Sequence, residues 1–172
     1  MRDVFRGLLL LLCGLALQAH ALTVQGDGLQ KVEIAQVPQR IVSLLPSLTE
    51  TVCALGACPR LVGLDRYSNW PESLKALPRV GGGLDPNIES IVALKPDLVL
   101  AAGSTRGVER LEALGLKVLR LEPRTHADVQ RVLRTVAEAL FMPETDSERV
   151  WREIQAGVQA AVQSLSPQAR QQ

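Results

Sequence analysis

Four short apolar runs, separated by segments whose apolar residues have helical spacing, dominate the chain between residues 41 and 121. They occupy residues 41–45, 61–64, 97–101 and 117–121. Short, continuously apolar runs are typical of strands that are buried on both faces. Strands that alternate with amphipathic helices form a parallel sheet, because right-handed crossovers place helices on both of its faces. The sequence therefore predicts an α/β fold, a three-layer lobe around a parallel sheet.

Capping residues set the expected starts of the first helices. Ser47 and Glu50 have the spacing of a capping box and predict a helix over residues 48–55. Asp85 followed by Pro86 predicts the start of another helix, since aspartate accepts from free backbone amides and proline is tolerated at the first helical position.

Two further helices are expected towards the end of the chain. Thr125 with Asp128 begins one that continues to about residue 140, and Pro143 follows it. From residue 145 to 165 the spacing is helical again, with an apolar stripe at four-residue steps formed by Val150, Ile154, Val158 and Val162. That helix is roughly 30 Å long at 1.5 Å per residue, which is more than one small lobe needs.

A β-hairpin is expected over residues 23–34, ahead of the first sheet strand. Two short alternating segments flank the turn residues Gly26, Asp27 and Gly28. We expect this hairpin to lie at an edge of the lobe.

The first 21 residues have the three parts of a secretory signal peptide. Arg2 and Arg6 form a basic region, residues 7–17 are apolar, and Ala19-His20-Ala21 offers small residues for cleavage. We expect export to the periplasm by this cleavable signal peptide, with a mature chain that begins at Leu22.

Composition argues against several functions. The formal net charge is +1 with both signs mixed, so the basic stripe of a nucleic-acid-binding surface is missing. Beyond the leader the only histidine is His126, which argues against a metal site of converging side chains and against an intrinsic cofactor of that kind. The chain has neither a Gly-x-Ser-x-Gly nucleophile motif nor a dinucleotide-binding fingerprint, so we expect no enzyme activity and assign no catalytic residues.

Two cysteines remain after the leader, Cys53 and Cys58. An exported chain meets an oxidising compartment, where such a pair can close a disulfide. The alternative is that Cys53 is a small buried hydrophobic residue and Cys58 a free thiol in a loop. The sequence leaves both possibilities open.

Two segments carry a resemblance to a known family: residues 39–50, QRIVSLLPSLTE, and residues 85–100, DPNIESIVALKPDLVL. Together they resemble the first lobe of the periplasmic binding proteins that serve vitamin B12, haem and iron-siderophore ABC importers. The resemblance implies a signal peptide over residues 1–21, an N-terminal lobe over 22–142, a connector helix between lobes over 143–165 and a polar tail over 166–172. Such proteins continue into a second lobe, so the resemblance implies that these residues are the first lobe alone, either as a truncated product or fragment or as a lobe kept for another role.

The expected ligand site lies in the loops that follow the strands, because ligands of open parallel sheets bind outside the carboxyl ends of the strands. Two of the chain's five aromatic residues fall in the loop of residues 65–70. The resemblance implies that Tyr67 lines the ligand cleft, whereas Trp70 is expected to pack as a structural residue. Gly83 stands where the vitamin B12-type pattern has a tryptophan over the corrin ring. The ligand-binding residues we predict are Pro46, Ser47, Arg66, Tyr67, Ser68, Asn69, Gly83 and Ser104.

The resemblance also implies the function and the partners. The ligand is a metal chelate, namely a corrinoid, haem or siderophore-bound iron, and the partner is the ABC importer permease in the inner membrane. Glu89 occupies the position of an acidic residue that docks onto permease arginines; without that role it is a solvated residue favoured by the helix dipole. The alternative function is a non-transporting interaction module, an orphan lobe that self-associates through the exposed connector helix.

Overall fold

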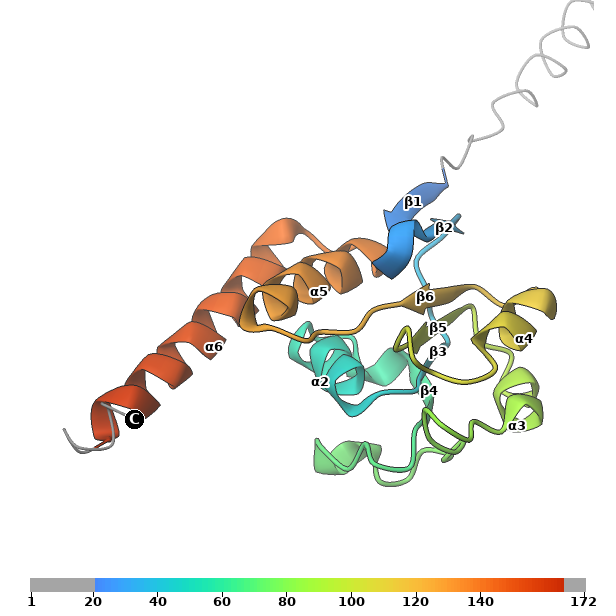
Figure 1. Cartoon of the computed structure of the whole chain (residues 1–172), viewed down its shortest axis with the longest axis horizontal. Coiled ribbons are helices and arrows are strands. Elements are labelled where there is room, and N and C mark those ends of the chain that lie inside the picture. Colours follow the sequence, from blue (N-terminus) through green and yellow to red (C-terminus); the bar gives the residue numbers. More distant parts are fainter. Residues whose placement is uncertain (1–20, 166–172) are drawn as a thin grey trace, which may run out of the picture.

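A four-stranded parallel sheet lies at the centre of the computed structural model, which describes residues 21–165 (Figure 1). Each strand runs parallel to its neighbours, with Ile41 opposite Leu98 and Val99 opposite Val118. The predicted α/β fold with a parallel sheet is confirmed. The strands, in the order β4-β3-β5-β6 across the sheet, are β4 Leu61–Leu64, β3 Ile41–Ser43, β5 Leu98–Ala101 and β6 Val118–Arg120.

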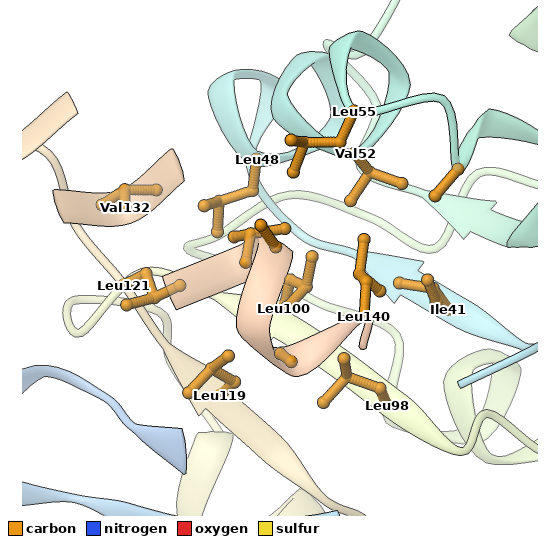
Figure 2. Close-up of a cluster of buried hydrophobic side chains, with 14 of the residues drawn as sticks. Ile41, Leu48, Val52, Leu55, Leu98, Leu100, Leu119, Leu121, Val132 and Leu140 are labelled. Atoms are coloured by element: carbon orange, nitrogen blue, oxygen red, sulfur yellow. The ribbon is translucent and has the colours of Figure 1, made fainter. Parts of the chain in front are cut away.

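Helices cover both faces of this sheet. Successive residues of a strand point to opposite sides, so each face presents its own apolar side chains to a layer of helices. Leu98 and Leu100 of β5 pack with helices α2 (Pro46–Ala54) and α5 (His126–Ala139) in one hydrophobic cluster. Figure 2 shows this cluster. Val99 and Ala101 point the other way and pack with α3 (Ile88–Ala93) and α4 (Val108–Ala113). The lobe thus has the three predicted layers.

Two helices begin at other residues than predicted. Helix α2 starts at Pro46 with Leu45 as its N-cap and no side-chain cap, so the capping box of Ser47 and Glu50 is wrong. Proline favours the first helical position because its ring presets the backbone angle, and this moves the start two residues earlier. Helix α3 is capped by Asn87, whose side chain accepts from the amide of Ser90, and not by Asp85.

The cap of α5 agrees with the sequence. The Thr125 hydroxyl accepts from the amide of Asp128, and the Asp128 carboxylate accepts from the amide of Thr125 at 2.9 Å. This reciprocal pair is the predicted capping box, and it fixes the first turn of the helix that covers the sheet.

The predicted N-terminal hairpin is present. Strands β1 (Leu22–Gln25) and β2 (Lys31–Ile34) pair antiparallel, and a 3-10 turn, η2 (Asp27–Leu29), joins them. The hairpin lies beside β6, where the Gln30 side chain donates to the carbonyl of Val118 and accepts from the amide of Arg120. It therefore sits against the edge strand of the sheet, as expected.

The long C-terminal helix α6 spans Glu144–Ser164 and packs against α5 through its first turns only (Figure 1). Val150 is buried and Ile154 half-buried, whereas every residue from 155 to 165 is exposed. The helix of residues 145–165 is confirmed, but only its first half contributes to the core.

Two 3-10 turns, η3 (Cys58–Arg60) and η4 (Glu72–Leu74), complete the fold, and a disulfide joins Cys53 to Cys58 across a Cα separation of 4.2 Å. Residues 1–20 of the expected signal peptide (residues 1–21) and the polar tail (166–172) lie outside the described residues. Within residues 21–165, no helix is long and apolar enough to cross a membrane.

Candidate functional site

A hollow of about 460 Å³ opens where β3, β4 and β5 end, and we call it the strand-end hollow. Its walls come from the segments that follow these strands and from the loop of residues 82–85. This is the edge at which ligands of parallel α/β sheets bind. The predicted ligand-binding residues that line it are Pro46, Arg66, Tyr67, Gly83 and Ser104.

Arg66 and Tyr67 form the most prominent wall of the hollow. The Tyr67 side chain is 65% exposed, and the Arg66 guanidinium lies 5.9 Å from the centre of its ring. Arg66 also forms an ion pair with Asp85, which in turn accepts from the amide of Gly82 at 3.2 Å. An aromatic face next to a positive charge suits a large, partly apolar ligand that carries acidic groups.

A buried polar network holds the loop that carries Tyr67. Asp65 is 1% exposed, and its carboxylate accepts from the amide of Tyr67 at 2.7 Å and from the hydroxyl of Ser68. The Ser68 hydroxyl lies 2.8 Å from that of Thr49, which lies 2.9 Å from that of Ser43. This chain of contacts ties the loop after β4 to helix α2 and to β3, so Tyr67 stands on a fixed base.

Gly83 forms the part of the wall without a side chain. A Cβ at this position would lie 3.6 Å from the Thr105 hydroxyl and 3.9 Å from the carbonyl of Leu44, which is ordinary contact distance. The backbone therefore does not require glycine here, and its effect is to leave space in the hollow. The Gly83 carbonyl accepts from the amide of Arg106 at 2.8 Å, which fixes its place in the rim.

The other predicted ligand-binding residues lie outside the strand-end hollow. Ser68 is buried in the network beneath the loop, and Asn69 is exposed beyond it. Ser47 lies next to Pro46 but borders a second hollow, together with Trp70. Trp70 was expected to pack as a structural residue, yet it is 63% exposed.

Glu89 lies in the first turn of α3 and is exposed. Among residues 21–165 its carboxylate has no ion-pair partner, so it is available to a cation on another molecule.

Ser104 lines the strand-end hollow and donates to the Glu122 carboxylate at 3.3 Å. No cluster of three or more His, Cys, Asp or Glu side chains that could hold a metal ion occurs within the described part of the chain.

Sequence reasoning missed several residues of the hollow, among them Asp65, Leu84, Asp85 and Thr105. Asp65 lies in the predicted ligand loop, residues 65–70, but it was not included among the predicted ligand-binding residues. Asp85 was assigned to a helix cap, and its pairing with Arg66 joins two loops that no local pattern connects.

Comparisons with known proteins show the family of this chain. Residues 41–172 match the sequence profile of the family described as periplasmic binding proteins. The chain belongs to this family. A vitamin B12-binding protein of Yersinia pestis is 42% identical over 97 residues, which cover 55% of this chain and 34% of that protein.

Two solved structures of periplasmic binding proteins share the fold. The heme-binding protein RhuT of Roseiflexus sp. RS-1 is 32% identical with a TM-score of 0.66, and the match covers 73% of this chain and 49% of RhuT. The vitamin B12-binding protein BtuF of Vibrio cholerae is 26% identical with a TM-score of 0.63, covering 76% and 53%. The chain thus spans about a third of the curated relative and about half of the solved ones.

Proposed function

We propose that this lobe captures a metal chelate, of the corrinoid, haem or ferric-siderophore class, and delivers it to an ABC importer in the inner membrane. The observation that carries the proposal is the strand-end hollow, with Tyr67 and Arg66 at the ligand-binding edge of a periplasmic binding protein fold. The names of the similar proteins, which bind vitamin B12 or heme, support this ligand class.

The hollow supports a bulky ligand with an apolar face. Leu84 is 70% exposed at its rim, and Gly83 leaves open the space that a tryptophan side chain would fill. Any iron or cobalt is expected to arrive inside the organic chelate, because chelation supplies the ligands that the lobe itself would otherwise have to provide.

Delivery requires a docking contact, and Glu89 is our candidate for it. Its exposed carboxylate at the start of α3, which has no ion-pair partner among residues 21–165, suits an arginine of a permease. Glu89→Lys is expected to abolish uptake of the ligand by cells while leaving its binding to the purified protein unchanged. Loss of binding in that variant would place Glu89 in the ligand site and contradict the docking role.

The first experiment is a titration of the chain from residue 22 onward with cobalamin, haem and ferric siderophores, followed by tryptophan fluorescence. Trp70, three residues from Tyr67, is the expected reporter. We expect one ligand to quench the fluorescence saturably. Tyr67→Ala should weaken that binding at least tenfold. Gly83→Trp should exclude haem or a siderophore chelate by filling the hollow, but not cobalamin, because the vitamin B12-type pattern has a tryptophan at this position.

The matched control is Leu114→Ala, which truncates another exposed side chain at the end of α4, outside the hollow. It should bind like the unaltered chain. Absence of saturable binding of all three ligands to a folded protein would overturn the proposal. The comparisons give no support to the alternative, a non-transporting interaction module.

A further inference from the structure

Among the described residues that line the strand-end hollow, those with a charge are Asp65, Arg66 and Asp85. Asp65 is buried, and both of its carboxylate oxygens already accept hydrogen bonds, from the Tyr67 amide and the Ser68 hydroxyl. Arg66 and Asp85 form an ion pair whose side chains are 46% and 59% exposed. This ion pair is therefore the charged part of the wall that an incoming ligand can reach.

Each partner of the ion pair has a second contact that holds it in place when the pair opens. The Asp85 carboxylate also accepts from the amide of Gly82 at 3.2 Å. The Arg66 amide donates to the carbonyl of Gly81 at 2.7 Å, and the guanidinium lies 5.9 Å from the centre of the Tyr67 ring. Because both side chains are also partly exposed to water, separating them leaves neither charge buried and unpaired, so the pair can open at a small cost.

We propose that Asp85 takes, in the free lobe, the place of a ligand carboxylate, and that a chelate with free carboxylates on its edge displaces it from Arg66. This inference rests on the proposed function and narrows its ligand class to acidic chelates. An arginine guanidinium binds a carboxylate through paired, charge-assisted hydrogen bonds, whichever molecule supplies the carboxylate. The apolar body of the chelate then lies against Tyr67 and Leu84, where Gly83 leaves space.

Asp85 acts in this scheme as an internal competitor that determines specificity. An acidic chelate gains a contact with Arg66 only by breaking the contact of Arg66 with Asp85, so the net gain is smaller than the new contact alone. The negative charge of Asp85 also stays beside the site and repels an anionic ligand. A chelate whose edge carries uncharged amides, such as cobalamin, gains less from Arg66, because a carboxylate accepts stronger hydrogen bonds than an amide does.

The test is a set of titrations of the chain from residue 22 onward with two forms of one ligand. Haem has free propionate carboxylates, and in haem dimethyl ester the carboxylates are blocked. Asp85→Asn keeps the shape of the side chain and an oxygen for the Gly82 amide, so we expect it to bind haem about threefold to tenfold more tightly. Arg66→Gln should bind haem about tenfold more weakly. Neither change should alter the affinity for the ester, whereas damage to the fold would weaken both.

The matched control is Glu72→Gln, which removes one negative charge from an ion pair with Lys75 outside the strand-end hollow. It should leave the affinity for haem unchanged. In a double-mutant cycle, Asp85→Asn should lose most of its gain once Arg66 is replaced, because Asp85 acts through Arg66. An equal gain from Glu72→Gln and Asp85→Asn would overturn the inference, as would equal effects on haem and its ester. Circular dichroism checks that each variant remains folded.

The failure of this inference can be told apart from the failure of the proposed function. Saturable binding of cobalamin or of uncharged ferrichrome, without binding of haem or ferric citrate, would overturn the inference and leave the proposed function standing. If ferric citrate binds in place of haem, the same variants should shift its affinity in the same directions, and unchanged affinities would overturn the inference. Absence of binding of all four chelates to a folded chain would overturn both.

Discussion

At the scale of single residues, the position of Tyr67 depends on groups that never reach the surface. Thr49 is fully buried, and its hydroxyl bridges those of Ser43 and Ser68, which in turn contacts the Asp65 carboxylate. A buried polar group is costly only when it loses its partner, so each member of this network depends on the others. The ligand loop is therefore held by hydroxyl groups beneath it.

Thr49→Val keeps the shape of the side chain and removes the hydroxyl. We expect the free energy of unfolding to fall by about 1–3 kcal/mol, because two buried hydroxyls lose a partner. Ligand affinity should fall as well, since the Tyr67 loop loosens. Urea unfolding and the fluorescence titration measure the two effects. Thr51→Val, at a half-buried position of the same helix, is the control, and an equal loss in both variants would argue against the network.

Asp128 gives the lobe a pH-dependent helix cap. Hydrogen bonds from the Thr125 side chain and the Arg124 backbone lower the pKa of the Asp128 carboxyl below its ordinary value. A carboxyl whose pKa is lower in the folded state stabilises the fold above its unfolded pKa, about 3.9, and this stabilisation is lost as the pH falls through the folded value. Asp128→Asn should therefore melt at a lower temperature than the unaltered chain at pH 7. The difference should narrow below about pH 4, and a constant difference down to about pH 2 would contradict this account.

At the scale of the elements, one carboxylate joins the N-terminal hairpin to the rest of the lobe. Asp27 in the hairpin turn accepts from Arg131 of α5 and from the backbone amide of Glu122, each at 2.6 Å. The Glu122 side chain accepts in turn from Ser104 at the strand-end hollow. The hairpin is thus connected through two contacts to the rim of the proposed ligand site.

Asp27→Ala removes both contacts of the hairpin turn. We expect a loss of about 1–2 kcal/mol in stability, reduced from the value of a buried pair because Arg131 remains partly exposed. Amide exchange should rise first in β1 and β2. Glu33→Ala, at an exposed position of β2, should change neither quantity, and faster exchange in that variant would show that the hairpin is loosened by any substitution.

The elements also show how far sequence reasoning reaches. Strands β3 to β6 were predicted within two residues at each end because apolar runs are a local signal. The caps of α2 and α3 were predicted wrongly, because α2 begins at Pro46 without a side-chain cap and Asn87, not Asp85, caps α3. The rule for parallel sheets located the strand-end hollow in advance. The ion pair of Arg66 with Asp85 could not be predicted, because it joins two loops and no spacing along the chain indicates it.

At the scale of the whole molecule, the two hollows lie on either side of the first turn of α2. Pro46 borders the strand-end hollow, whereas Ser47 borders the second hollow, between α2, α5 and the first half of α6. Neighbouring residues of one turn therefore face two different hollows. The local stability of the helix is expected to differ between the two halves of α6, because only residues up to Ile154 pack against the lobe.

Hydrogen exchange can resolve this difference. A helical segment of about 11 residues without packing against the lobe is only marginally stable in water, so the amides of residues 158–164 should exchange far faster than those of α5. The first half of α6 serves as the internal control, since it packs against the lobe and its amides should exchange slowly. Exchange of residues 158–164 as slow as that of α5 would contradict this account.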